Sequence, residues 1–592
     1  MSIKDLPRAK IKRRIVNESR ENAAKAEGLD PLLARILAAR PTLLEVSVRD
    51  MLAPKLKTLD PPQTLPDIDK AVARIATALA RGEVIGIETD HDCDGQTSHA
   101  VLYCALVNIF GHPPEKIRSY IGHRLKEGYG LSRALAERIL ADEPQPSLVI
   151  TADNGSSDEA QIALLKAHGI DVIVTDHHEI PIEGIPQSAY AVVSPTREDS
   201  QYPDRFIAGC MVAWLLMAAV RAHLSKTTAK EFASLAECLD FVAVGTIADC
   251  VSVARSQNNR AVVSYGMKLI AQGLRPCWRA LLPILSTPLS SEDLGFKIGP
   301  LLNSDGRLAC ALGSVSFLLA KTDSEAREWV AHLQEQNAER KSIQDNITRR
   351  ALEQALIQFN AQKNSLCIFL EDGHAGVHGI SASRVKDWFG RPVIILCPKQ
   401  DDANVLTGSA RGVDGVHLRD ALQAVHDSAP DIFIKFGGHQ AAAGLTIHRE
   451  KFNALAEAFE VVIQQQIDKS ELGPVVWSDG ELSIESVTVP FIKQMVDQLE
   501  PFGREFEPPA FELTGKIVSA TVMGQTKTHL RLGLAVDELW FEAVWFNCCD
   551  PNESLPVTVG ETVNLVYVPK VQTFRGQMKL SCQVIHLEKC GI

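Results

Sequence analysis

Residues 84–95 of the sequence read VIGIETDHDCDG, and this stretch decides the fold. A short apolar run passes directly into three aspartates at alternate positions, Asp90, Asp92 and Asp94. Short apolar runs that end in polar residues are typical of buried strands, and residues 96–110 have the apolar spacing of a helix. The stretch therefore predicts a strand followed by a helix, with carboxylates at the carboxyl end of the strand.

The same pattern recurs twice further along the chain. Residues 148–153 (LVITAD) and residues 171–178 (DVIVTDHH) are again apolar runs that end in polar groups. The side chains at these two ends are Asp153, Asp176, His177 and His178. Strands that alternate with helices predict a parallel sheet with right-handed crossovers. Because the carboxyl ends of parallel strands lie at one edge, we expect these side chains to meet there.

Clustered carboxylates and imidazoles predict a metal site. Several carboxylates cannot stay ionised side by side unless cations neutralise them. Imidazole among the ligands favours a transition ion such as Mn²⁺ over an all-oxygen Mg²⁺ site. Asp249 follows the apolar run 241–247, and we expect it to lie at a further strand end and to join the cluster. A calcium loop is excluded, because the position that requires Glu is Val101.

Length, charge and cysteine usage limit the class of protein. The 592 residues predict three or four domains. The 61 Lys and Arg against 73 Asp and Glu give a net charge of −12, which excludes a surface that is basic throughout but not a basic groove. The N-terminus is polar and no long apolar run follows, so we expect neither a secretion signal nor a membrane span. Thirteen scattered cysteines without a C-x-x-C pair indicate reduced thiols in the cytoplasm.

Changes of pattern divide the chain into an α/β region, a long charged helix, a second α/β region and a set of alternating β segments. The expected parts are an N-terminal extension (1–60), a catalytic α/β domain (61–323), a connecting helix (324–359), a second, substrate-binding α/β domain (360–472) and a β-barrel (473–592).

Several motifs resemble the DHH phosphoesterase superfamily and, within it, the bacterial RecJ family. The strings that resemble the superfamily are DHDCDG (90–95), TADNG (151–155), VTDHH (174–178) and IADC (247–250). Those similar to RecJ motifs are EGYGLS (127–132), GPLLNSDGRL (299–308), GGHQAAAG (437–444) and LEPFG (499–503). The resemblance spans about 80 to 590, nearly the whole chain.

The resemblance implies a DHH domain, a DHH-associated domain and an OB-fold barrel. It also implies a 5′→3′ exonuclease that digests single-stranded DNA to 5′-mononucleotides with two Mn²⁺ or Mg²⁺ ions. Carried onto this sequence, it assigns the metal ligands Asp92, Asp94, Asp153, His177 and Asp249, with Asp90 as a weaker ligand. His178 would contact the scissile phosphate or act as an acid, and Asp176 would orient an imidazole.

Groups that hold the DNA strand are expected in both α/β domains, because such a nuclease grips phosphates rather than reading bases. We expect 437–439 and 408–411 to form phosphate-binding turns and Arg384 to lie at the start of a helix. The candidate substrate-binding residues are Arg124, Lys126, Asn303, Arg307, Ser381, Arg384, Arg411, Gly437, Gly438 and His439.

The sequence departs from the family pattern at several positions. His91 and Cys93 replace an aromatic residue and an alanine between the aspartates, and His91 is an additional candidate ligand. Leu301 replaces an arginine, which removes one phosphate clamp. The Gly-rich, acidic continuation after LEPFG is altered to Arg504, Glu505 and Phe506.

Two alternatives stay open at this point: a phosphodiesterase of short oligonucleotides or cyclic dinucleotides, and a non-catalytic single-strand-binding scaffold. The barrel and the length favour the nuclease over the first, and the intact ligand set favours it over the second. As partners, the resemblance implies single-stranded DNA, single-strand binding protein and a helicase, and we expect a monomer.

Overall fold

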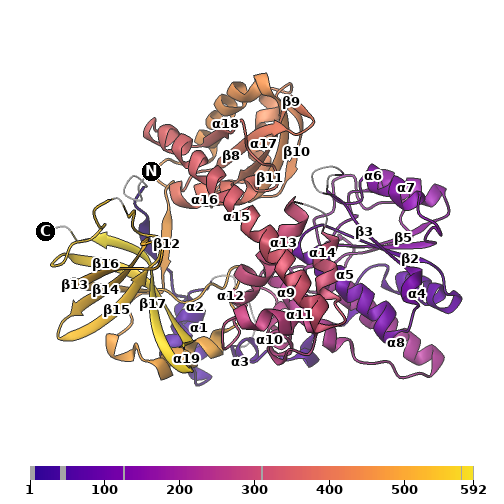
Figure 1. Ribbon diagram of the computed structural model, residues 1–592, viewed down its shortest axis with the longest axis horizontal. Helices are drawn as coiled ribbons and strands as arrows, with labels where there is room; N and C mark the ends of the chain where they lie inside the picture. The colour runs from indigo at the N-terminus through magenta and orange to yellow at the C-terminus, as the bar shows by residue number, and fades with distance from the viewer. Residues whose placement is uncertain are drawn as a thin grey trace. The chain divides into compact units, whose positions relative to one another are not determined.

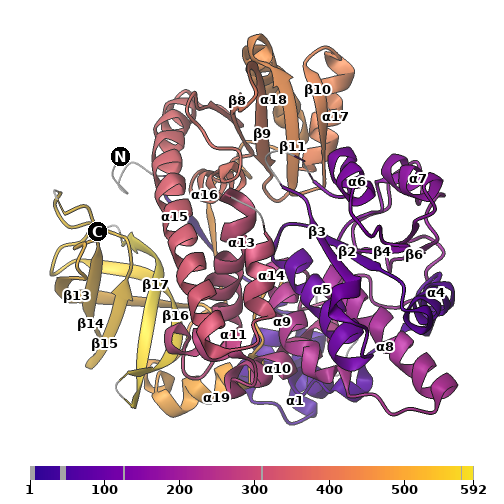
Figure 2. The same ribbon diagram turned by 45° about the vertical axis from the view of Figure 1, so that its right-hand side comes forward.

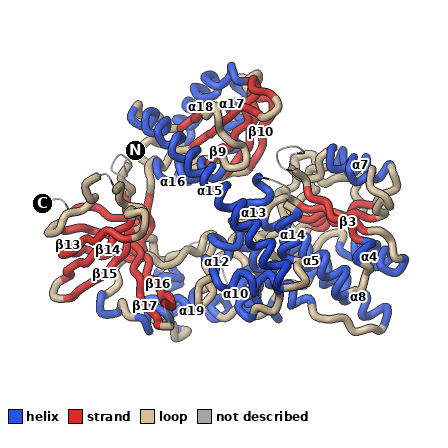
Figure 3. Tube along the Cα trace, in the orientation of Figure 1, coloured by secondary structure: helices blue, strands red, loops and turns tan. Residues whose placement is uncertain are grey.

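The computed structural model describes residues 7–40, 48–123, 127, 129–308, 311–551, 553–574 and 576–590. The chain forms two compact units. Unit 1 contains Met1–Ile15, Ala338–Lys493 and Pro509–Ile592, and unit 2 contains Val16–Asn337 and Gln494–Pro508. Figures 1 and 3 label their helices and strands.

Unit 2 is built on a sheet of five parallel strands. In sheet order they are β3 (Ile117–Ile121), β2 (Ile85–Thr89), β4 (Leu148–Ala152), β5 (Asp171–Thr175) and β6 (Ala191–Val193). The strands expected after residues 84, 148 and 171 are confirmed as β2, β4 and β5. The edge strand β3 escaped prediction, because Arg118 and Ser119 interrupt its apolar residues.

Helices cover both faces of this sheet. On one face lie α4 (Ile68–Arg81), α5 (Cys93–Tyr103, continued by the π-helical turn η4, Cys104–Ile109) and α8 (Gly209–Thr228). On the other face lie α6 (Arg133–Leu140) and α7 (Glu159–Ala167). The chain leaves β2 toward β3 and then returns to the other side of β2 at β4, so the direction of winding reverses between β2 and β4. Ligand sites in such sheets lie beyond the strand ends at this reversal.

A helical layer follows the sheet in sequence and packs on α5. It contains α9 (Leu239–Ala248), α10 (Gln257–Gln272), α13 (Gly299–Leu308) and α14 (Leu312–Leu318). The expectation that Asp249 ends a strand was wrong, because residues 241–247 belong to α9. This helix is buried on all sides, and an apolar run without polar positions does not distinguish a buried helix from a buried strand.

Unit 1 contains a mixed sheet with three helices. The strands, in sheet order, are β10 (Phe433–Gly438), β11 (Ala442–His448), β9 (Asp402–Arg411), β8 (Val393–Lys399) and β7 (Leu366–Phe369). The helices are α16 (His378–Phe389), α17 (Leu418–Ser428) and α18 (Phe452–Gln466). The expected turn at 408–411 was wrong: these residues lie inside β9, which hydrogen-bonds to β8 and β11 on its two sides.

The expected long helix is present as α15 (Asp323–Asn360), which Figure 2 shows along its length. The expected barrel is also present. It closes in the order β13 (Phe511–Met523), β14 (His529–Val536), β15 (Leu539–Trp545), β17 (Gln577–Lys589) and β16 (Thr562–Phe574). A two-stranded parallel pair joins β1 (Lys10–Arg13) to β12 (Val475–Ser478). Among the described residues, no helix has the length and apolar character that crossing a membrane requires.

Candidate metal centre

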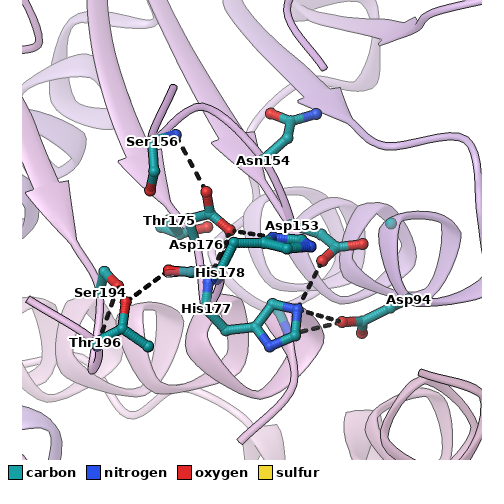
Figure 4. A network of polar contacts seen from close by, with 12 residues as sticks. Asp94, Asp153, Asn154, Ser156, Thr175, Asp176, His177, His178, Ser194 and Thr196 are labelled. Atoms are coloured by element: carbon teal, nitrogen blue, oxygen red, sulfur yellow. Dashed lines mark hydrogen bonds and ion pairs between the residues drawn. The ribbon is translucent and has the colours of Figure 1, made fainter. Parts of the chain in front are cut away.

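The motif side chains meet at the carboxyl ends of β2, β4 and β5, beside the end of α9. Figure 4 shows Asp94, Asp153 and His177 close together. His177 Nε2 lies 3.2 Å from Asp153 Oδ1 and 3.6 Å from Asp249 Oδ2. It also lies 3.9 Å from Asp94 Oδ2. Three groups have ligand atoms within 4.8 Å of one another, and together they comprise Asp90, Asp92, Asp94, Asp153, His177, His178 and Asp249. The structure therefore brings every predicted ligand into one cluster.

Two aspartates of the first motif are fixed by helix N-termini. Asp92 caps α5, where its Oδ1 accepts the N–H groups of Asp94 (2.9 Å) and Gly95 (3.2 Å). The fully buried Asp94 carboxylate accepts the N–H groups of Gly209 (2.7 Å) and Cys210 (3.0 Å) at the start of α8. Helix N-termini attract negatively charged groups, and these hydrogen bonds fix the orientation of both side chains.

Asp153 occupies a strained position between these elements. Its φ is 65°, a left-handed conformation that side chains other than Gly rarely adopt, and its N–H donates to Thr175 O at 3.0 Å. A Cβ on Gly209 would lie 2.7 Å from Asp153 Cβ, so α8 approaches this closely only because residue 209 is glycine. Strained backbone of this kind is concentrated at functional sites.

Two buried ligand atoms lie next to each other but form no hydrogen bond. Within the described residues, buried Asp153 Oδ1 and His177 Nε2 have no hydrogen-bond partner. The His177 ring also hydrogen-bonds to the backbone of Ile207, which leaves Nε2 as the atom that faces the carboxylates. Buried polar atoms rarely lack a hydrogen-bond partner, so these two atoms indicate a site that can bind a cation.

The pKa shifts of the carboxylates also indicate a cation site. Burial first, and then the neighbouring carboxylates, raise the pKa of Asp153 and of Asp249 well above the usual range. The same causes raise the pKa of Asp92. The cluster therefore cannot be fully ionised unless cations neutralise it. A set of carboxylate oxygens and imidazole nitrogens fits divalent ions such as Mn²⁺.

Asp176 orients His178 rather than joining the ligands. Its Oδ1 accepts the backbone N–H of His177 (2.8 Å) and the Nδ1–H of His178 (2.8 Å), while Oδ2 accepts the N–H of Ser156 (3.1 Å). Burial lowers the pKa of His178, but the hydrogen bond and charge of Asp176 outweigh it and raise the pKa to about 9. Thr196 Oγ1 fixes the loop by donating to the carbonyl of His178 at 2.7 Å (Figure 4). His178 is therefore held as an oriented cation.

Tyr129 was missed by the sequence analysis. Its Oη lies 3.2 Å from His178 Nε2, within hydrogen-bond distance, so the imidazole ring has an oxygen partner at each nitrogen. The available signal was its place inside EGYGLS, a segment that the sequence analysis matched without assigning a role to the hydroxyl.

The residues around the aspartate loop have structural roles. His91 Nδ1 pairs with Asp90 Oδ1 at 2.8 Å, and His91 belongs to none of the three ligand groups. Asn303 Oδ1 accepts the N–H of Cys93 at 2.8 Å, so α13 supports the loop. A Cβ on Gly306 would collide with the carbonyl of His91. Arg124 and Lys126 lie outside the described residues, as does the side chain of Arg307.

The other predicted substrate-binding residues lie in unit 1, around α16 and the β10–β11 hairpin. The buried Ser381 hydroxyl bonds to Thr348 Oγ1 at 2.9 Å. Arg384 lies within α16, not at its start, and pairs with Asp345 at 3.1 Å. Arg411 Nε donates to Ser383 Oγ at 3.2 Å. Gly437 and Gly438 end β10, and His439 begins the turn to β11.

A carboxylate–imidazole cluster at the reversal of a parallel sheet defines a DHH-type metal-dependent hydrolase. Residues 84–246 match the DHH family, N-terminal domain, and residues 362–465 match the DHHA1 domain. Residues 478–586 match the RecJ OB domain. The single-stranded-DNA-specific exonuclease RecJ of Haemophilus influenzae is 34% identical over 571 residues, which cover 94% of this chain and 96% of that protein. The chain belongs to the RecJ family.

Two further comparisons agree. RecJ of Escherichia coli K12 is 33% identical over 596 residues, which cover 96% of this chain and 97% of that protein. The crystal structure of RecJ from Thermus thermophilus in complex with Mn²⁺ has a TM-score of 0.78 and 24% identity, and it covers 99% of this chain and 80% of that chain. The whole architecture, from the parallel sheet to the barrel, is thus a RecJ fold.

Proposed function

We propose that this protein is a single-stranded-DNA-specific exonuclease that uses two divalent ions, Mn²⁺ or Mg²⁺, and releases 5′-mononucleotides in the 5′→3′ direction. One observation carries the proposal: a buried cluster of carboxylates and imidazoles has ligand atoms that lack hydrogen-bond partners, in a chain one third identical to RecJ exonucleases over almost its full length.

Different residues of the metal centre would bind the ions and contact the phosphate. Asp92, Asp94, Asp153, His177 and Asp249 would hold the ions, with Asp90 as a weaker ligand and Asp153 as the residue expected to be shared between them. When bound, two such ions activate a water and neutralise charge on the phosphate during in-line displacement. His178, kept protonated by Asp176, donates a hydrogen bond to a phosphate oxygen or a proton to the leaving oxygen. Tyr129 limits the rotation of the His178 ring.

The remaining sequence predictions keep their place as proposals. Ser381, Arg384, Arg411, Gly437, Gly438 and His439 would hold the strand, together with Arg124, Lys126 and Arg307. Asn303 would act through the aspartate loop that it supports. The domain boundaries 1–60, 61–323, 324–359, 360–472 and 473–592 remain part of the proposal. A cytoplasmic monomer that works with single-strand binding protein and a helicase completes the proposal.

One labelled-strand assay tests the activity. The protein is incubated with Mn²⁺ and with single or double strands that carry a label at the 5′ or the 3′ end. We expect the 5′ label to appear at once as a mononucleotide from single strands only. Cleavage restricted to dinucleotides would support the oligonucleotide phosphodiesterase instead, and binding without cleavage would support the scaffold.

A further inference from the structure

Residues 503–506 form a tight turn in the segment of unit 2 that follows α19 (Val489–Leu499). Gly503 and Phe506 exchange both backbone hydrogen bonds, each at 3.1 Å, so Arg504 and Glu505 occupy the tip. Glu505 has a φ of 64°, the conformation for which a turn favours glycine at this position. The tip is thus a strained arrangement that carries an arginine, at the point where the sequence departs from the family pattern.

Buried contacts hold this segment against unit 2. Arg260, which is fully buried, donates to the carbonyls of Leu499 (2.9 Å) and Pro501 (3.2 Å). Its guanidinium also lies 4.7 Å from the ring centroid of buried Phe506. Each of these groups would be costly to expose or leave unpaired, so the base of the turn is fixed.

The tip is fixed as well, against the loop that follows α9. The Glu505 carboxylate accepts hydrogen bonds from Ser252 Oγ (2.5 Å) and Arg255 Nε (3.0 Å). The carbonyl of Arg504 accepts the N–H of Val253 at 3.3 Å. The inward-facing Glu505 thereby sets the direction of its neighbour, Arg504.

Arg504 reaches the rim of the metal centre. Its Nη1 lies 3.5 Å from the carbonyl oxygen of Cys250, the residue directly after the ligand Asp249. The side chain is exposed, and within the described part of the chain it forms no ion pair. An arginine with most of its donors available therefore stands beside a metal ligand.

We propose that Arg504 binds a phosphate group of the DNA strand at the metal centre. The inference rests on the proposed nuclease function and adds a substrate-binding residue to it. A guanidinium presents five donors in a planar fork that matches phosphate oxygens. The ligand carboxylates repel a polyanion, and a fixed cation at their rim reduces that repulsion where the strand must enter. The turn holds this cation in place before the strand arrives, which limits the entropy lost on binding.

The first test measures binding without catalysis. Fluorescence anisotropy in EDTA compares the wild type with Arg504→Gln and Arg504→Lys on a 5′-phosphorylated oligothymidylate. We expect Arg504→Gln to weaken binding about 10-fold or more and to reduce the slope of log K against log salt by about one. Arg504→Lys keeps the positive charge but not the planar guanidinium, so its affinity for the oligonucleotide should lie between those of the wild type and Arg504→Gln. Lys268→Gln, which removes an exposed cation on α10, should leave both quantities near wild type.

The second test measures turnover with Mn²⁺ on the same oligonucleotide. We expect Arg504→Gln to lower kcat/KM by about 10- to 100-fold, with an unchanged melting temperature. Unchanged binding and salt slope would overturn the inference, as would a loss explained by a lower melting temperature. A wild type that binds DNA through Arg504 but cleaves nothing would refute the nuclease function alone, so the two failures are distinguishable.

Discussion

Asp153→Asn is predicted to have opposite effects on stability and on activity. The variant retains the shape of the side chain, and asparagine tolerates the left-handed backbone at this position, where φ is 65°. What it removes is one negative charge from a buried group of carboxylates. The metal-free protein should therefore become more stable, while metal binding and catalysis should be lost.

The magnitudes follow from burial. Asp153 is 2% exposed, and burial with repulsion from Asp94 and Asp92 raises its pKa well above the usual range. Relieving one such uncompensated charge should stabilise the metal-free protein by about 1–3 kcal/mol. Losing a ligand that is proposed to serve both ions should remove several kcal/mol of transition-state stabilisation, which corresponds to a fall of about 10³-fold or more in kcat.

Thermal melts with EDTA and with Mn²⁺, beside the labelled-strand assay, measure both quantities. Wild type should melt higher with Mn²⁺, and Asp153→Asn should lose that increase. The control is Asp293→Asn, another buried aspartate of unit 2, whose carboxylate accepts hydrogen bonds from Ser286 and Ser290. It should lower stability yet retain the response to Mn²⁺. If Asp153→Asn kept full activity, the bridging role would be refuted.

The other predictions concern the packing, the histidine and the pH dependence of the centre. Gly245→Ala places a Cβ against Thr97 and 2.7 Å from Asp94 Oδ1, so it should weaken Mn²⁺ binding measured by calorimetry. An unchanged affinity would show that the neighbouring side chains move to accept the extra methyl group. Tyr129→Phe removes the hydroxyl 3.2 Å from His178 and should lower kcat about 10-fold without changing Mn²⁺ affinity. An unchanged kcat would show that this hydroxyl does not contribute to catalysis. Mn²⁺ affinity should fall as the pH is lowered through the neutral and acidic range, because burial raises the pKa of the ligand carboxylates Asp153 and Asp249 and protons then compete with the ion. A constant affinity over this range would contradict that account.

The sequence predicted both the sheet and the ligands because most ligands lie in loops that directly follow the strands of the sheet. Each ligand-bearing loop follows an apolar run with a clear period, so finding β2, β4 and β5 also located Asp94, Asp153 and His177. The alternation of strands and helices brought these loops together, since parallel strands end at one edge, and the family resemblance assigned the ligands within them.

The predictions that were wrong or absent can also be explained physically. Asp249 was placed on a strand because a helix buried on all sides shows no polar positions. The turn at 408–411 was inferred from small residues, yet small residues also suit a central strand that is crowded on both sides. The contact between Tyr129 and His178 joins residues 49 positions apart, and no local pattern reports such a contact.

The segment 494–508 has a consequence for how the protein is made. Unit 2 begins near residue 16, yet buried Arg260 finds its acceptors at Leu499 and Pro501, more than two hundred residues later. During synthesis, the ribosome therefore translates the intervening sheet of unit 1 before the catalytic unit is complete. A fragment that stops at residue 337 would leave that guanidinium buried without these partners. Unit 2 thus lacks these contacts until the polypeptide is long enough to contain the sheet of unit 1 as well.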